Sequence, residues 1–253
     1  MAKRRVLLTR KDNSALAELL KSGGVEVVEM PLIDCAYTVN ADDASDVFDE
    51  LGGYDWITFS SPNSVRGFFK AFFDEFADIR SLGIARIACV GESTARELQK
   101  FFIKADVVPQ KQTAVEMANA MGEFQSLENL KILSVRGNLA LPELVKALEK
   151  HNAIVDTFEV YRTSHKKLAH TDAAVGDFKK SGADIVVFAS PSAVESFVKN
   201  AETLALEDGA VRPKVVAIGP TTAEAVRKFS MKVAAEAEAP TAEAVYNAIS
   251  SLL

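Results

Sequence analysis

Short apolar runs alternate with amphipathic segments along the whole chain. Several runs are almost continuously hydrophobic, which is typical of strands buried on both faces of a parallel sheet. Between them, apolar residues recur at the i, i+3 and i+4 spacing of a helix with one buried face. The expected strands are 6–8, 25–30, 56–59, 87–90, 106–108, 132–135, 153–161, 185–188, 215–218 and 232–234, and the clearest expected helices are 14–21, 64–76 and 141–150. This alternation predicts an α/β protein with parallel sheets.

The apolar residues on the expected helices are assigned to the core, Phe73 and Leu141 among them. Cys35 and Cys89 lie in apolar runs without metal spacing, so we expect both to be buried free thiols.

The chain repeats itself at an interval of roughly 128 residues, which is far too long for a solenoid. Residues 55–68 return at 184–197, residues 87–95 at 215–223, and residues 113–121 at 241–249. The repeat predicts two similar parallel-sheet α/β domains. Paired α/β domains bind ligands in the cleft between them, so a ligand cleft is expected there.

Polar turns follow the repeated strands. Ser61 and Ser190 each precede a proline at the expected start of a helix, where serine caps and proline fits the first turn. Free amides and the helix dipole make such turns suitable for anions, and strand ends form the ligand-binding edge of open α/β sheets. The alternative is that these turns only cap helices. The candidate anion-binding residues are Arg10, Ser61, Asn63, Ser64, Ser93, Thr94, Arg136, Gly137, Ser190, Ser192, Thr221 and Thr222.

Tyr161 closes the apolar run that precedes a polar linker. Its hydroxyl is a hydrogen-bond donor and a candidate proton source for a ligand in the cleft. The alternative is that the ring only fills a hinge.

Charge and composition narrow the function classes. The net charge is −6 and no basic stripe is evident, which disfavours nucleic-acid binding. No apolar stretch has the length of a membrane span and no signal peptide is evident, so we expect a cytoplasmic protein. The three histidines lack ligand spacing, and no glycine-rich nucleotide or phosphate loop occurs. We therefore expect no metal and no cofactor, and a nucleotide-dependent enzyme is disfavoured.

The chain resembles the uroporphyrinogen-III synthase family over essentially its whole length. Six motifs in the family's order carry the resemblance: residues 8–10, 55–65, 91–95, 160–163, 188–194 and 218–223. It implies two α/β domains, one of residues 1–35 plus 164–253 and one of residues 36–163. A two-stranded β connector containing residues 35–39 and 160–164 would join them.

The resemblance also implies the reaction. Hydroxymethylbilane, a linear tetrapyrrole polycarboxylate, would lose water and close to uroporphyrinogen III through an azafulvene and a spiro intermediate, with ring D inverted. Tyr161 would be the proton donor to the leaving hydroxyl, Thr94 and Thr222 would line the cleft, and Ser61 and Ser190 would match the family's Ser-Pro turns. No cofactor would be needed. Hydroxymethylbilane synthase would be a transient partner, and the chain would be a monomer.

Four positions depart from the family pattern. Phe102, Asn152 and Ser230 stand where the family often has glycine in a turn, and Leu141 stands where it often has arginine. The last change removes a cation from the expected substrate rim. The competing interpretation is a non-catalytic tetrapyrrole-binding or sensing module of the same fold.

Overall fold

The computed structural model describes residues 3–10 and 13–253, which form two compact units. The terminal unit comprises the chain up to Asp34 together with Ser164–Leu253. The inserted unit is Cys35–Thr163. Cys35, assigned by sequence to the end of the first segment, thus begins the inserted unit.

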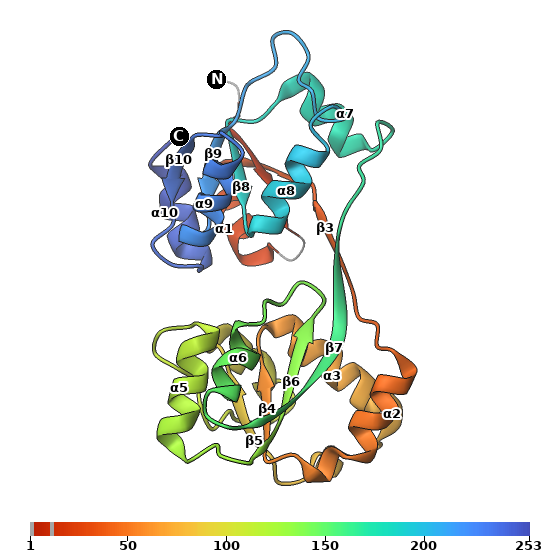
Figure 1. Ribbon diagram of the computed structural model, residues 1–253. Coiled ribbons are helices and arrows are strands. Elements are labelled where there is room, and N and C mark those ends of the chain that lie inside the picture. Colours follow the sequence, from red (N-terminus) through yellow and green to blue (C-terminus); the bar gives the residue numbers. More distant parts are fainter. Residues whose placement is uncertain (1–2, 11–12) are drawn as a thin grey trace. The chain divides into compact units, whose positions relative to one another are not determined.

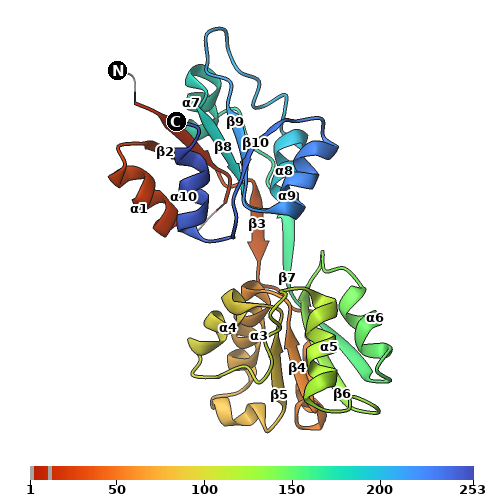
Figure 2. The ribbon, with the colours of Figure 1, turned by 90° about the vertical axis from the view of Figure 1, so that its left-hand side faces the viewer.

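The terminal unit is a parallel sheet covered on both faces by helices, and Figure 2 shows α1 and α10 on one side and α8 and α9 on the other. Apolar side chains of α7, α8 and α9 form one buried cluster and those of α1 and α10 another. In the described residues the sheet order is β10-β9-β8-β1-β2, with β1 (Arg5–Leu8), β2 (Glu26–Glu29), β8 (Ile185–Phe188), β9 (Lys214–Ala217) and β10 (Val233–Glu236). The helices are α1 (Ser14–Ser22), α7 (Ala173–Ser181), α8 (Pro191–Lys199), α9 (Pro220–Lys228) and α10 (Ala242–Ser250).

The inserted unit repeats this plan. Helices α2, α3 and α4 pack on one face of its sheet through a phenylalanine-rich cluster, and α5 and α6 pack on the other (Figures 1 and 2). Its described strands have the order β3-β7-β6-β4-β5, with β3 (Ile33–Ala36), β4 (Trp56–Phe59), β5 (Arg86–Cys89), β6 (Lys131–Gly137) and β7 (Ile154–His165). The helices are α2 (Ala41–Asp49), α3 (Pro62–Glu75), α4 (Glu92–Gln99), α5 (Ala114–Phe124) and α6 (Glu143–Glu149), with short 3₁₀ turns at Leu51–Gly53 and Ile79–Leu82.

The structure confirms the expected fold of two similar parallel-sheet α/β units. Repeated segments form the same elements: β4 and α3 correspond to β8 and α8, and β5 and α4 correspond to β9 and α9. Thr113 and Thr241 both cap the helix that follows. Both points at which the chain passes from one unit to the other lie within β3 and β7, which are neighbouring strands.

Two strand assignments were wrong. The expected strand at 106–108 is reduced to a single bridge between Ala88 and Val107. The hydrophobic pattern predicted no strand at β3, because its sequence, Ile-Asp-Cys-Ala, is short, partly polar and mostly exposed at the sheet edge. Only the connector that the family resemblance implied, at 35–39, overlaps it.

Three burial assignments were also wrong. Leu141 is 70% exposed, because a residue before proline disfavours helical conformation and α6 begins only after Pro142. Phe73 is 45% exposed beside Phe101 at the margin of the core. Cys35 is exposed on β3, whereas Cys89 is buried, and burial raises the pKa of the Cys89 thiol to about 12.

Candidate functional site

In the inserted unit, the predicted residues lie at the carboxyl ends of adjacent strands. Ser61 follows β4, Thr94 follows β5, Gly137 ends β6, and Tyr161 lies near the end of β7. Because these strands are parallel and have the order β7-β6-β4-β5, the four residues share one edge of the sheet. We call this edge the inserted-unit rim.

Ser61 links the first turn of α3 to Tyr161. Its hydroxyl accepts a hydrogen bond from the Ser64 amide at 3.1 Å, and the Ser64 hydroxyl accepts one from the Ser61 amide at 3.1 Å, which completes a capping box. The Ser61 Oγ also lies 3.2 Å from the Tyr161 hydroxyl oxygen. The serine therefore serves both as a helix cap and as the polar neighbour of the tyrosine.

Gly137 creates the space for the Tyr161 ring. A Cβ atom at position 137 would lie 2.3 Å from the ring, a separation that no side chain can adopt. A register shift between Arg136 and Gly137 brings Gly137 opposite Tyr161. Burial raises the pKa of the Tyr161 phenol above its ordinary value, so at neutral pH the group is a proton donor.

A cavity of about 320 Å³ opens beside these residues. Ser60, Ser61, Arg136 and Tyr161 supply its polar lining together with Glu143 and Ser134, and exposed Leu141 is part of its wall. The Arg136 guanidinium donates to the Ala140 carbonyl at 2.7 Å. Within 3–10 and 13–253, no carboxylate forms an ion pair with Arg136, so its charge is not neutralised within the described part of the protein.

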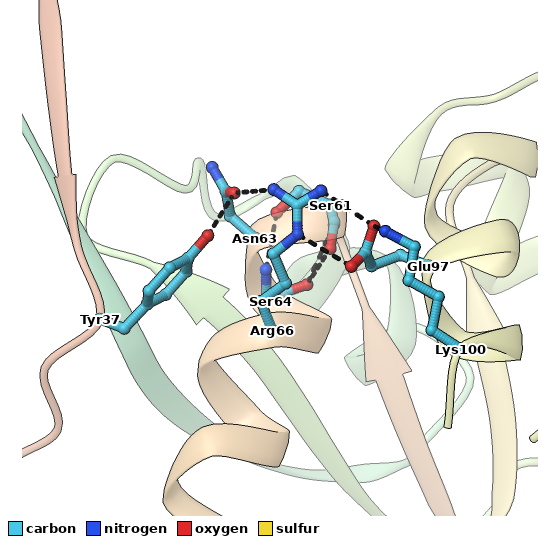
Figure 3. A network of polar contacts seen from close by, with 7 residues as sticks. All are labelled: Tyr37, Ser61, Asn63, Ser64, Arg66, Glu97 and Lys100. Atoms are coloured by element: carbon cyan, nitrogen blue, oxygen red, sulfur yellow. Dashed lines mark hydrogen bonds and ion pairs between the residues drawn. The ribbon is translucent and has the colours of Figure 1, made fainter. Parts of the chain in front are cut away.

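Asn63 belongs to a polar network that sequence reasoning missed (Figure 3). Its side-chain oxygen accepts a hydrogen bond from the Tyr37 hydroxyl at 3.0 Å and a longer one from Arg66 at 3.4 Å. Arg66 in turn binds both carboxylate oxygens of Glu97 at 2.9 Å, and Lys100 binds Glu97 at 2.9 Å. The network fixes Asn63 and ties the first two turns of α3 to α4.

Glu97 gives the only sequence signal for this network that we can identify. It lies on the buried face of α4 between Thr94 and Leu98, and a buried carboxylate requires a cationic or hydrogen-bonding partner. The hydrogen bonds that Arg66 donates to the Glu97 carboxylate lower the pKa of Glu97 and raise the pKa of Arg66.

Thr94 and Ser93 differ although both lie in the first turn of α4. Ser93 is exposed, whereas Thr94 is 1% exposed and its hydroxyl has no hydrogen-bond partner within the described residues. Neither residue lines the 320 Å³ cavity. The structure thus places them on the same rim but not in the same hollow as Tyr161.

The terminal unit carries the second half of the predicted set, along the adjacent strands β9-β8-β1. Ser190 caps α8 by accepting from the Ala193 amide at 3.2 Å, and its hydroxyl lies 3.0 Å from that of Ser192. In the first turn of α9, Thr221 is exposed and Thr222 is buried. Arg10 is exposed directly after β1. We call this edge the terminal-unit rim.

Neither a metal centre nor a membrane span is found in the part of the chain that the structure describes. No group of three or more histidine, cysteine, aspartate or glutamate side chains there has the geometry of a metal site. No helix among the same residues is long and apolar enough to cross a bilayer. The side chains described at the two rims supply amides, hydroxyls, arginines, the phenols of Tyr161 and Tyr37, and the Glu143 carboxylate.

Two parallel-sheet units with anion-compatible turns at their strand ends define a ligand-binding α/β protein with two units. The chain belongs to the uroporphyrinogen-III synthase family: a family model described as uroporphyrinogen-III synthase HemD matches residues 14–247. The match confirms the resemblance drawn from the six sequence motifs.

Individual relatives agree with this assignment. The chain is 26% identical over 233 residues to the uroporphyrinogen-III synthase of Chlorobaculum parvum, a match that covers 90% of each chain. It is 27% identical over 243 residues to the porphyrin biosynthesis protein HemD of Ruminiclostridium josui, a match that covers 90% of this chain. The match spans only 44% of the length of that second relative.

Solved structures show the same fold. A mutant uroporphyrinogen III synthase from Thermus thermophilus matches with a TM-score of 0.66 at 18% identity, covering 98% of each chain. The uroporphyrinogen-III synthetase of Helicobacter pylori matches with a TM-score of 0.65 at 18% identity, covering 99% of this chain and 100% of that one.

Proposed function

We propose that this protein converts hydroxymethylbilane to uroporphyrinogen III, with inversion of ring D and loss of one water molecule. The observation that carries the proposal is the Tyr161 phenol, held protonated by burial, 3.2 Å from Ser61 and beside a cavity that contains Arg136. A neutral proton donor next to a cation suits a substrate that carries both a leaving hydroxyl and carboxylates.

Tyr161 donates its proton to the terminal hydroxyl of the substrate. The carbon–oxygen bond breaks, water leaves, and the electron pair of the pyrrole nitrogen stabilises the resulting azafulvene. The substituted carbon of ring D attacks the electrophilic methylene carbon of the azafulvene to give a spiro intermediate, which fragments and closes again with ring D inverted. The ring carbon that forms the final bond loses a proton, which balances the one that Tyr161 gave.

The rims bind the substrate carboxylates. On the inserted-unit rim, Ser61 at the start of α3 lines the same cavity as Arg136, and the first turn of α4 follows the neighbouring strand β5. On the terminal-unit rim, α8 and α9 begin with the same kind of turn, and Arg10 follows strand β1 of the same sheet. The proposed substrate contacts are Arg10, Ser61, Asn63, Ser64, Ser93, Thr94, Arg136, Gly137, Ser190, Ser192, Thr221 and Thr222.

Much of this catalysis is conformational. A bilane closes without help to the isomer in which ring D is not inverted, so the protein must hold the chain in a geometry that favours the other closure. Numerous carboxylate contacts provide that control, and none of them is a covalent nucleophile. We also propose that the protein acts as a monomer and receives its substrate in transient contact with hydroxymethylbilane synthase.

The test is a coupled assay. Hydroxymethylbilane is generated by its own synthase, the protein is added, and the oxidised uroporphyrin isomers are separated by chromatography. We expect a change from isomer I to isomer III that scales with the amount of protein. Isomer I alone, from a sample with native circular dichroism, would reject the synthase and favour a tetrapyrrole-binding or sensing module, which titration with uroporphyrin would then detect.

A further inference from the structure

A second and larger cavity lies in the terminal unit. Its volume is about 830 Å³, within the range of small-molecule sites in proteins. The floor is formed by the nearly inaccessible side chains of Phe178, Val186, Leu204 and Val215. Half-buried apolar side chains, Met231 among them, form the walls.

This cavity is separate from the proposed substrate contacts. Lys214 and Val233, which line it, are the first residues of β9 and β10. It therefore lies at the amino ends of the strands, whereas the terminal-unit rim lies at their carboxyl ends. None of its lining residues belongs to the substrate-binding set proposed above.

The cavity wall is held in place by backbone hydrogen bonds. The segment between α8 and β9, the long blue loop of the terminal unit in Figure 1, includes Leu204 and Leu206 of the lining. The Glu207 amide donates to the Lys179 carbonyl at 2.9 Å, and the Val211 amide donates to the Ser181 carbonyl at 3.2 Å. These two hydrogen bonds fix the loop to the end of α7 and so hold this wall of the cavity in place.

Cations surround an otherwise apolar hollow. Arg212, Lys214 and Lys232 are exposed and belong to the lining, which includes no acidic residue. Lys214 donates to the Leu252 carbonyl at 3.2 Å, and within the described residues none of the three cations forms an ion pair. An apolar floor with unneutralised cations at its margin is complementary to an amphipathic anion.

We propose that this cavity binds an organic anion with a hydrocarbon body, of the class of medium-chain fatty carboxylates. The hydrocarbon lies on Phe178, Val186 and Val215, and the carboxylate faces Arg212 and Lys232. The proposal stands independently of the synthase activity.

Titration calorimetry with dodecanoate, below its micellar concentration, tests the proposal. We expect saturable binding of one dodecanoate per chain and at least tenfold weaker binding of dodecan-1-ol, which lacks the charge. The double variant Arg212→Glu/Lys232→Glu should weaken dodecanoate binding by about tenfold, and rising salt should reduce that difference. Lys199→Glu/Lys228→Glu, which reverses two exposed cations of the same unit outside the lining, is the matched control and should leave binding unchanged.

A second variant tests the hollow itself. Ala234→Phe adds bulk to a half-buried wall residue at the register shift of β10, so it should abolish binding while the isomer III yield is retained. Absence of saturable binding to the native protein would overturn the proposal. So would equal binding of acid and alcohol, equal losses in the two charge variants, or undiminished binding in a folded Ala234→Phe variant.

Discussion

Tyr161 combines an unusual environment with an ordinary chemical group. Burial disfavours its ionised form, and this raises the pKa of the phenol above its usual value of about 10. Only the protonated form can donate, and that form is fully populated throughout the neutral range. The residue is therefore suited to giving a proton and unsuited to acting as a base.

Tyr161→Phe should lower kcat on the order of 10- to 100-fold with little change in KM, because water can partly replace a general acid. Since the raised pKa lies above 10, the native rate should not fall through ionisation of this group between pH 7 and 9. The measurement is kcat of the native protein and of Tyr161→Phe at several pH values between 7 and 9. If the native rate fell between pH 7 and 9 while the rate of Tyr161→Phe stayed constant, Tyr161 would ionise in that range. That result would contradict the raised pKa of the buried phenol.

Glu97 contributes stability that depends on pH. Arg66 lowers its pKa in the folded protein, so the contribution is present above the unfolded pKa of about 4.3 and is lost as pH falls through the lower folded value. Glu97→Gln should cost about 1.5 kcal/mol of unfolding free energy at pH 7, less than for a fully buried pair because Arg66 is partly exposed.

Urea unfolding of the native protein and Glu97→Gln at pH 7 and pH 3.5 tests this, with a smaller difference expected at the lower pH. Asp74→Asn breaks the exposed pair with Lys70 and is the matched control, with little effect expected. If the difference in unfolding free energy between the native protein and Glu97→Gln were larger at pH 3.5 than at pH 7, the proposed lowering of the Glu97 pKa would be contradicted.

At the scale of elements, the caps of α3 and α8 are a matched pair. Each helix begins with serine at the cap and proline in the first turn, but only the Ser61 hydroxyl contacts Tyr161. Ser61→Ala and Ser190→Ala should each cost about 1 kcal/mol of stability. Only Ser61→Ala should lower kcat, and Ser190→Ala should act on KM; measured stabilities and rate constants separate the two. If Ser61→Ala and Ser190→Ala lowered kcat equally, the Ser61–Tyr161 contact would have no specific role in catalysis.

The turns after α4, α6 and α9 each contain a residue in the left-handed backbone conformation. Phe102, Asn152 and Ser230 have φ of 60°, 59° and 58°, and these are the three turn positions at which the resemblance led us to expect glycine. The left-handed conformation costs a residue with a Cβ roughly 1–2 kcal/mol, and asparagine tolerates it best. Phe102 is fully exposed, so its side chain contributes no packing in compensation.

Phe102→Gly and Ser230→Gly should therefore raise the unfolding free energy by about 1 kcal/mol, after allowance for the greater freedom of glycine in the unfolded chain. Asn152→Gly should change it little. Urea midpoints of the three variants give the ranking directly. If Asn152→Gly proved the most stabilising, backbone strain would not be the explanation.

The strands were predictable where both faces are buried, because a run such as Ile185–Phe188 has no other stable environment. Strand β3 could not be predicted from hydrophobic pattern, because an edge strand with exposed side chains has no continuous apolar run. Proline before α6 displaced the expected helix start and exposed Leu141. Capping serines could be identified from local sequence, but the Ser61–Tyr161 and Arg66–Glu97 contacts depend on strand order and register, which periodicity does not encode.

For the whole molecule, each hydrophobic cluster lies within a single unit. Trp56, the single tryptophan of the sequence, is fully buried in the inserted unit. Its fluorescence therefore reports on one unit only. The internal repeat indicated two domains, and the prediction that one of them is discontinuous in sequence came only from the family resemblance.

A fragment of residues 33–165 should fold alone, because it contains every strand and helix of the inserted unit. Its tryptophan emission and urea midpoint should match those of the full chain. In the full chain, Phe102→Gly should shift the tryptophan transition and Ser230→Gly should not. An unfolded fragment, or a Ser230→Gly shift in the tryptophan signal, would show that the units do not fold independently.

The order of strands in the terminal unit bears on how the protein is made. Strand β1 is an interior strand that lies between β2 and β8, yet β8 is synthesised almost 180 residues later. On the ribosome, the inserted unit can be completed while the hydrophobic β1 segment still lacks that neighbour. Strand β2 can pair with one edge of β1 early, but a nascent chain would expose the other edge of this apolar strand for most of its translation, a situation that favours chaperone binding.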